Sequence, residues 1–186
     1  MPQKAKITRE EIVGAALGLV RKNGIESLNA RSLAKRLGVS TQPIFSHFAS
    51  MKELERATFD EAQSFYESRI SAAIASDPVR PYRASGMAYI TLAREEPRLF
   101  RWLFMRDRTG EEDKGTAEIE GLLKLLQDRL GLSREDALLF HLEMWVVVHG
   151  IATMVATSYQ NWNKETVSRI LTDCYRGLLK RYGKEY

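Results

Sequence analysis

The chain has 186 residues, with 28 Lys and Arg against 24 Asp and Glu and a hydrophobic share of 44%. This length can bury a real core in one domain or two small ones, and the composition argues against intrinsic disorder. The single cysteine, Cys174, excludes an intramolecular disulfide scaffold, and no paired Cys and His spacing indicates a zinc site, so we expect no metal and no cofactor.

The positive charge lies in the first third of the chain. Residues 1–56 carry ten Lys and Arg and five Asp and Glu, a net +5, whereas residues 57–186 carry eighteen and nineteen, a net −1. A basic head on a near-neutral body suits a protein whose head binds phosphates. The alternative is a chance distribution of surface charge.

No segment has the pattern of a targeting signal or a membrane span. The first six residues lack the apolar core of a signal peptide, and the strongest apolar run, residues 144–148, is far too short to cross a bilayer. We therefore expect a cytoplasmic protein with no membrane association.

Apolar residues recur every three to four positions almost throughout, which predicts helices. The first covers residues 8 to about 22, with Thr8 and Glu11 as a capping box and Gly24 after its end. A second helix, capped by Asn29 or Ser27, ends at Gly38. A third runs from Thr41 to about His47 with Ser40 as its cap.

The later helices are longer. They are expected at residues 51–75, 81–95, 97–105, 117–130, 133–159 and 164–182, with a polar loop at 109–116. No alternation typical of strands and no internal repeat occurs. The sequence therefore predicts an all-α fold of about nine helices.

Residues 28–48 have the pattern of a helix-turn-helix. Leu33, Ala34 and Leu37 bury the first helix, and Gly38 can adopt the left-handed turn. In the second helix we expect Ile44, Phe45 and Phe48 to anchor the inner face, and short polar side chains to lie on the outer face. The alternative is an ordinary helical hairpin.

These residues resemble the tetracycline-repressor (TetR) family of transcriptional regulators. The resemblance rests on Leu33-Ala34, Leu37-Gly38-Val39-Ser40, Ile44-Phe45-Ser46-His47-Phe48 and Lys52-Glu53-Leu54, and it is strong over residues 8–58. It implies a three-helix DNA-binding domain at residues 1–50 and a helical effector-binding and dimerisation domain at residues 51–186.

Two positions depart from the family pattern. Phe45 stands where the family usually has Tyr, so a phosphate contact from a Tyr hydroxyl is absent. Met51 stands where the family usually has Lys, which leaves Lys52 and backbone N–H groups to supply the phosphate contact at the start of the fourth helix.

Ten residues are the predicted DNA contacts. Arg31 suits a phosphate, Gln42 suits an adenine edge, and Pro43 suits a thymine methyl group. The full set is Asn29, Arg31, Ser40, Thr41, Gln42, Pro43, Phe45, Ser46, His47 and Lys52. His47 is either a phosphate ligand or a packing residue, and Lys4 and Lys6 are expected to form a basic arm.

Residues 145–150 resemble the Trp-x-x-x-His-Gly signature of one class of C-terminal domain in this family. His141, Trp145 and His149 share one helix face because they are four residues apart. They form either the wall of an effector pocket or a core- or dimer-facing stripe. The predicted effector-binding residues are Phe65, Met87, Phe100, Phe104, His141, Trp145 and His149.

The last two helices, about residues 133–182, carry apolar stripes that either pack within one chain or form a dimer interface. The resemblance implies the second, a four-helix interface between two copies.

We therefore expect a bacterial, dimeric, ligand-responsive regulator, most simply a repressor, that binds a palindromic double-stranded DNA operator and is released by a small-molecule effector. A helical enzyme is the first rival, but no phosphate loop, nucleophile motif or carboxylate pair supports it. A helical adaptor that binds only protein is the second rival. It leaves the polar face of residues 31–47 unexplained.

Overall fold

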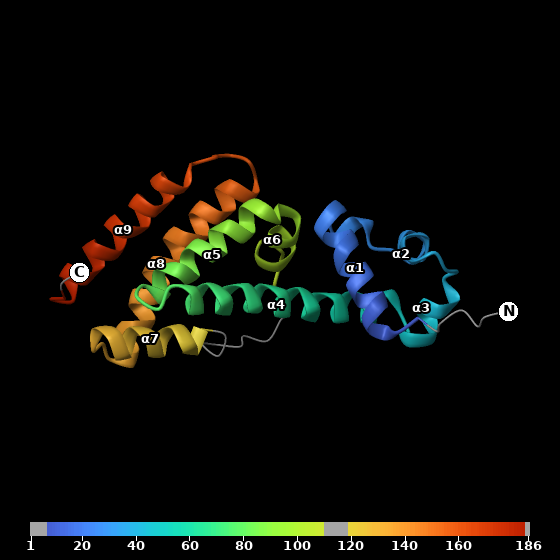
Figure 1. Cartoon of the computed structure of the whole chain (residues 1–186), viewed down its shortest axis with the longest axis horizontal. Helices are drawn as coiled ribbons and strands as arrows, with labels where there is room; N and C mark the ends of the chain where they lie inside the picture. The colour runs from blue at the N-terminus through green and yellow to red at the C-terminus, as the bar shows by residue number, and fades with distance from the viewer. Residues whose placement is uncertain (1–6, 110–118, 185–186) are drawn as a thin grey trace. The chain divides into compact units, whose positions relative to one another are not determined.

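Helices make up nearly all of the regular structure in residues 7–109 and 119–184, the residues that the computed structural model describes (Figure 1). The helices are α1 (Arg9–Asn23), the 3-10 turn η1 (Ile25–Ser27), α2 (Ala30–Leu37), α3 (Gln42–His47), α4 (Met51–Ser76), α5 (Pro81–Glu95), α6 (Pro97–Phe104), α7 (Glu120–Leu130), α8 (Arg134–Ala156) and α9 (Lys164–Arg181). Within those ranges no strand occurs, so the all-α prediction with about nine helices is confirmed.

Side-chain caps fix where several helices begin. Before α1, the Glu11 N–H donates to Thr8 Oγ1 at 3.1 Å and the Thr8 N–H donates to Glu11 Oε2 at 2.8 Å. This is the predicted capping box, and it satisfies two backbone N–H groups that have no partner inside the helix. Ser133 and Asn163 each cap a helix, α8 and α9, by accepting from a backbone N–H three residues later.

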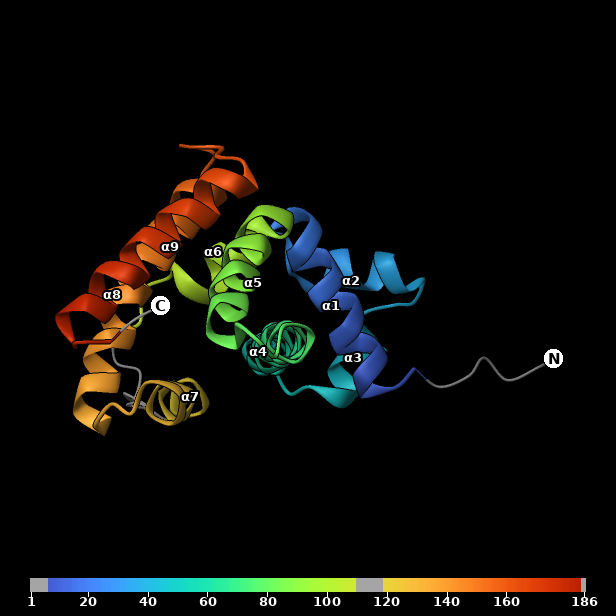
Figure 2. The same ribbon diagram turned by 60° about the vertical axis from the view of Figure 1, so that its left-hand side comes forward.

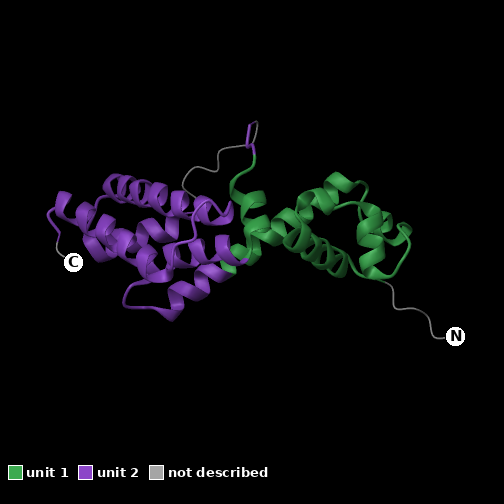
Figure 3. Cartoon of the chain, turned by 90° about the horizontal axis from the view of Figure 1, so that it is seen from above, with its two compact units in different colours: residues 1–68, 96–106 green, residues 69–95, 107–186 purple. Residues whose placement is uncertain are grey.

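Contacts divide the described residues into two compact units (Figure 3). Unit 1 is drawn from residues 1–68 and 96–106, and unit 2 from residues 69–95 and 107–186. Helix α4 runs unbroken through the change at residue 69, and α6 belongs to unit 1 because it packs on α1. This division concerns packing only, and the functional boundary at residue 50 stays a prediction.

Unit 1 holds two apolar clusters. The first joins the inner faces of α1 to α4, with Ile12, Leu33, Ile44, Phe48 and Leu54 at its centre. The second joins α1, α4 and α6, where the rings of Phe59 and Trp102 meet edge to face with centroids 5.2 Å apart. Because α1 and α4 both contribute to each cluster, these two helices together hold unit 1.

Unit 2 is built around α8, which packs against α5, α7 and α9, as two views of the ribbon show (Figures 1 and 2). Phe140 of α8 is fully buried. The centroid of its ring lies 5.3 Å from that of Tyr175 on α9 and 6.3 Å from that of Tyr82 on α5. By length and composition α8 could also cross a membrane. Burial of one of its faces in unit 2 accounts for part of that apolar character.

Several predicted boundaries need correction. Ser40 does not cap α3: Thr41 is the N-cap residue, and it makes no side-chain cap. The reason is local, since Pro43 has no N–H to donate and the N–H of Ile44 already bonds to the Thr41 carbonyl oxygen at 3.2 Å. Helix α2 is capped by Asn29 and not by Ser27.

Helix α8 ends at Ala156, three residues before the predicted end at Tyr159. Ser158 has φ 58°, and the N–H groups of Tyr159 and Gln160 both turn back to the Met154 carbonyl oxygen. The polar character of residues 157–161 already indicates such a turn. The arm with Lys4 and Lys6, most of the loop at 109–116 and the first residues of the helix expected from 117 lie outside the described residues.

Two glycine substitutions test the backbone of the helix-turn-helix. Gly38 has φ 66°, where a Cβ is strained, so Gly38→Ala should destabilise the protein by about 1–2 kcal/mol. Gly14 lies in the middle of α1 with open space where an added Cβ would lie, so Gly14→Ala should stabilise the protein by roughly 0.5–1 kcal/mol. Chemical denaturation of the two variants measures both effects. A loss of stability at Gly14 or none at Gly38 would contradict this description of the turn.

Candidate nucleic-acid interface and effector domain

The turn between α2 and α3 is closed by backbone hydrogen bonds. Gly38 has left-handed torsion angles of φ 66° and ψ 30°, and its N–H donates to the carbonyl oxygens of Ala34 and Lys35. The Val39 N–H donates to the Ala34 oxygen at 3.1 Å. The end of α2 is thus satisfied in the manner of a Schellman motif, and the chain leaves it in a fixed direction.

The inner face of α3 is held by Ile44 and Phe48, which are 0% and 1% exposed. The guanidinium of Arg9 lies over the ring of Phe48, 4.8 Å from its centroid. The expectation that Phe45 also anchors this face is wrong, because its side chain is 47% exposed. Ile44 and Phe48 are one helical turn apart, whereas Phe45 is rotated by about 100° from Ile44.

All ten predicted DNA contacts lie in unit 1, at the start of α2, in or beside α3, and in the first turn of α4. Seven are exposed, namely Asn29, Arg31, Ser40, Gln42, Phe45, Ser46 and Lys52, and three are half-buried, namely Thr41, Pro43 and His47. Phe45 therefore adds an exposed aromatic ring to an otherwise polar surface.

Two of these side chains have short-range partners inside the protein. Asn29 caps α2 by accepting from the Ser32 N–H at 3.0 Å, and its amide group donates to the Ser27 carbonyl oxygen. The Ser46 hydroxyl donates to the Pro43 carbonyl oxygen at 2.7 Å. Both side chains therefore already serve the local fold.

His47 has a partner far away in the sequence. Its Nε2 lies 2.9 Å from the Ile7 carbonyl oxygen. Because a carbonyl oxygen only accepts, this ring nitrogen carries the proton. His47 thereby fastens the start of α1 to the predicted recognition helix, which agrees with the packing alternative of the sequence analysis.

A variant of the capping box, which sequence analysis missed, opens α4: the Glu53 carboxylate reaches back to the N–H of Ala49, one residue before the N-cap Ser50. The Glu53 N–H donates to Ser50 Oγ at 3.2 Å, and Glu53 Oε2 accepts from the Ala49 N–H at 2.7 Å. The Ser-x-x-Glu spacing of residues 50–53 signals this motif. The box fixes the first turn of α4, from which the exposed Lys52 projects.

The seven predicted effector residues divide between the units. Phe65, Phe100 and Phe104 belong to unit 1, where the ring centroids of Phe100 and Phe104 lie 5.1 Å apart. Met87, His141, Trp145 and His149 belong to unit 2. Within unit 2 the two histidines lie opposite α5, whereas Trp145 is 44% exposed.

Two Tyr-His hydrogen bonds link α5 to α8. The hydroxyl of Tyr82 lies 3.0 Å from His141 Nδ1, and that of Tyr89 lies 2.9 Å from His149 Nδ1. Burial lowers the pKa of both imidazoles and raises the pKa of the Tyr82 hydroxyl. Both shifts favour the uncharged forms, in which Nδ1 of His141 accepts from the Tyr82 hydroxyl. The indole of Trp145 stacks on the His149 ring, with centroids 4.8 Å apart.

Met87 lines an open cleft of unit 2, and the other predicted effector residues are not among the cleft's lining. Arg83 and Lys164 also line it. Sequence periodicity does not find these two residues, because a turn of α5 and the start of α9 come together only in the folded unit. In residues 7–109 and 119–184, no three His, Cys, Asp or Glu side chains gather as metal ligands would.

Substitution of His141 tests the buried Tyr-His pair through pH. The folded state holds the pKa of His141 below its ordinary value, so the unfolded chain binds the proton first as the pH falls below about 6.5. The contribution of the neutral His141 imidazole to the free energy of unfolding is therefore fully present above that pH and is lost as the pH falls. When the pH is lowered from about 7.5 to about 5.5, the melting temperature of His141→Gln should therefore fall less than that of the wild type.

Tyr82→Phe is the matched control, because it removes the same hydrogen bond but keeps the titrating group. It should retain most of the wild-type pH dependence. Equal acid sensitivity in the wild type and in His141→Gln would show that His141 does not carry the effect.

Comparisons with known proteins agree with this architecture. Residues 12–58 match the family of bacterial regulatory proteins of the tetR family, and residues 82–175 match the tetracyclin repressor-like C-terminal domain. A protein of Mycobacterium tuberculosis described as an uncharacterized HTH-type transcriptional regulator is 28% identical over 161 residues, which cover 82% of this chain and 72% of the relative. Members of this family are DNA-binding transcription factors and not enzymes. The chain belongs to the TetR family of helix-turn-helix transcriptional regulators.

Proposed function

We propose that this TetR-family regulator is a homodimeric, cytoplasmic repressor that binds a palindromic operator and is released by a small-molecule effector. In this proposal residues 1–50 are the DNA-binding domain and residues 51–186 bind the effector and form the dimer. The observation that carries the proposal is the exposed, mainly polar outer face of α3 on a buried support, within the basic N-terminal third of the chain.

The two sides of α3 support a division of roles. Ile44 and Phe48 are buried in the core, while Gln42 and Phe45 on the other side are exposed. A rigid support of this kind orients base-reading side chains in a groove. Gln42 suits an adenine edge, and the exposed ring of Phe45 suits a thymine methyl group or a sugar.

Arg31 and Lys52 suit phosphate contacts on either side of α3 in the sequence. Both are exposed cations in the first turn of a helix, where free backbone N–H groups also favour phosphate. Asn29 and His47 would then act indirectly: Asn29 holds the start of α2, and His47 holds α3 to α1.

The proposed dimer interface is supported by an exposed apolar stripe on α8. Leu139, Leu142 and Val146 are 41%, 44% and 63% exposed, and their spacing of three and four residues places them on one face. Trp145 beside them is 44% exposed. An uncovered stripe of this size favours burial against a second copy, and a two-fold axis would present two α3 helices to a palindrome.

Release by an effector requires two spacings of the DNA-binding domains. Binding to B-DNA requires recognition helices about one turn, roughly 34 Å, apart. An effector that prefers another spacing lowers the affinity for DNA by no more than the ratio of its affinities for the two states. Helix α4 is a covalent route for such a change, because its residues 51–68 belong to unit 1 and its residues 69–76 to unit 2.

Substitutions on the DNA face should separate phosphate contacts from base contacts. Arg31→Ala and Lys52→Ala should weaken binding to all sequences and each reduce the slope of log K against log salt by about one. Gln42→Ala should cost about 1–3 kcal/mol on the operator and relax specificity at one position. Fluorescence anisotropy with promoter fragments near the gene, at several salt concentrations, measures both quantities.

Lys124→Ala is the control, since Lys124 is an exposed cation on α7 of unit 2. It should leave the salt slope unchanged. The specific form of the proposal fails if the dimer binds no promoter fragment more tightly than random DNA. Transcription of the adjacent gene in a deletion strain distinguishes a repressor, for which it rises, from an activator.

A charge in the α8 stripe should break the dimer. Val146→Asp places a carboxylate on the most exposed apolar residue of the stripe, so it should give a folded monomer with strongly reduced operator affinity. Val79→Asp is the matched control, because Val79 is 75% exposed in the turn before α5. Sedimentation velocity measures the mass of both variants, and a dimer that survives Val146→Asp would place the interface elsewhere.

A further inference from the structure

An open cleft of about 320 Å³ lies in unit 2 between the end of α4, one face of α5 and the first residue of α9. Its lining includes the cations Arg69, Arg83 and Lys164 and one carboxylate, Asp77. All of these residues belong to unit 2. The cleft does not include the Tyr-His pairs.

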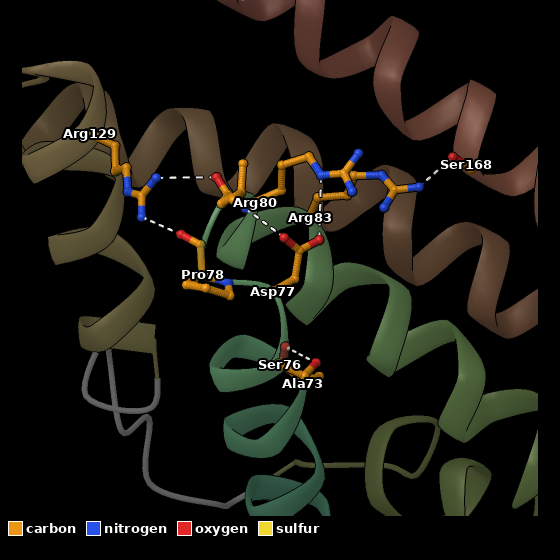
Figure 4. Close-up of polar contacts among 9 residues, drawn as sticks. Ala73, Ser76, Asp77, Pro78, Arg80, Arg83, Arg129 and Ser168 are labelled. Carbon is orange, nitrogen blue, oxygen red and sulfur yellow. Dashed lines mark hydrogen bonds and ion pairs between the residues drawn. The ribbon is translucent and has the colours of Figure 1, made fainter.

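Two of the four charges in the lining are already neutralised. Arg69 pairs with Glu95. Asp77 pairs with Arg80 at 3.4 Å and also accepts from the Arg80 backbone N–H (Figure 4). Arg83 and Lys164 form no ion pair with any residue that the structure describes. The cleft therefore holds an excess of two positive charges.

Arg83 is the better placed of these two cations. It is half-buried, and its guanidinium donates to the Ser168 hydroxyl at 2.6 Å, as Figure 4 shows. That bond uses one of five N–H donors and fixes the direction of the side chain. The remaining donors have no partner among the described residues, and a half-buried guanidinium in this state favours an anion with two oxygens.

Lys164 adds charge to the cleft from another helix. It is the first residue of α9, so the partial positive charge of that helix end adds to the positive charge on this side of the cleft. An anion bound by Arg83 would therefore meet a second cation, while the one carboxylate of the lining, Asp77, is already paired with Arg80.

The rest of the lining is mainly small and apolar. Ala73, Ala84 and Ala88 leave room, and Met87 supplies an adaptable surface. A volume of about 320 Å³ equals that of about ten water molecules at ~30 Å³ each. This is the space of a small organic molecule and lies at the low end of the range for ligand sites.

We propose that this cleft binds a small organic carboxylate, with its carboxylate between Arg83 and Lys164 and its apolar body against Met87 and the alanines. Binding itself does not depend on the proposed repressor function. Its regulatory consequence does: the carboxylate would be the effector, acting on the part of α4 that lines the cleft.

Titration of the full-length protein without DNA tests the site. Benzoate and hexanoate serve as probes, benzamide and hexanol as neutral analogues, and inorganic phosphate as an anion without an apolar body. Calorimetry at low salt should show saturable binding of at least one carboxylate. The neutral analogues and phosphate should bind at least tenfold more weakly.

Three variants assign the binding to the cleft. Arg83→Gln and Lys164→Gln should each weaken carboxylate binding at least tenfold, and Ser168→Ala should weaken it several-fold because Arg83 loses its orientation. Arg169→Gln is the control, because Arg169 is an exposed cation on α9 that does not line the cleft, and it should bind as the wild type does. Because Lys164 is exposed, Lys164→Gln should fold, and it tests the site even if Arg83→Gln fails to fold.

The inference is overturned if no carboxylate probe binds with a Kd below about 1 mM. It is equally overturned if phosphate binds as tightly, or if the cleft variants bind as the wild type does. A parallel operator titration keeps the two proposals apart. A carboxylate that binds but leaves the operator complex intact refutes the regulatory role alone. A protein that binds a carboxylate but no operator refutes the repressor function, and with it the regulatory role, but not the binding site.

Discussion

A helix of six residues cannot keep its shape in water through its own hydrogen bonds. Helix α3 therefore exists only because Ile44 and Phe48 are buried among α1, α2 and α4, and because Gly38 turns the chain toward that core. His47 adds a hydrogen bond to the start of α1. The exposed face of α3 is thus a property of the whole four-helix cluster, and any change that loosens the cluster would also disorder that face.

Unit 2 solves a different problem, since its interior contains polar rings. A buried hydroxyl or imidazole without a partner is costly, and here each tyrosine of the two pairs on α5 satisfies a histidine of α8. The two pairs recur after seven residues on α5 and eight on α8, so they hold these helices in one register. This arrangement explains why histidines suit these positions without any bound metal or catalytic role.

The features that could be predicted from the sequence are those set by neighbours along the chain. The apolar spacing, the Thr8-Glu11 box and the Gly38 turn all depend on residues within one helical turn, and the structure confirms them. The errors arise where two local rules compete. Ser40 is a good cap by residue type, but Pro43 removes the N–H that a cap would need, and Phe45 is apolar but lies on the wrong face of a very short helix.

What the sequence could not show is chemistry assembled across long separations. Arg83 bonds to Ser168 and shares a cleft with Lys164 only because α5 and α9 come together in the same unit, and no motif joins these residues. Charge arithmetic misses them for the same reason, since residues 57–186 sum to a net −1.

A net charge averages over a surface, whereas binding responds to the field within about a Debye length, roughly 8 Å at physiological salt. Residues 57–186 can therefore have no net attraction for a phosphate backbone and still hold two cations without ion-pair partners in one cleft. The net charge of a segment can therefore indicate a phosphate-binding head, but it cannot indicate a small anion site such as the one proposed. Such a site becomes visible only when the ion-pair partner of each charge is known in the folded unit.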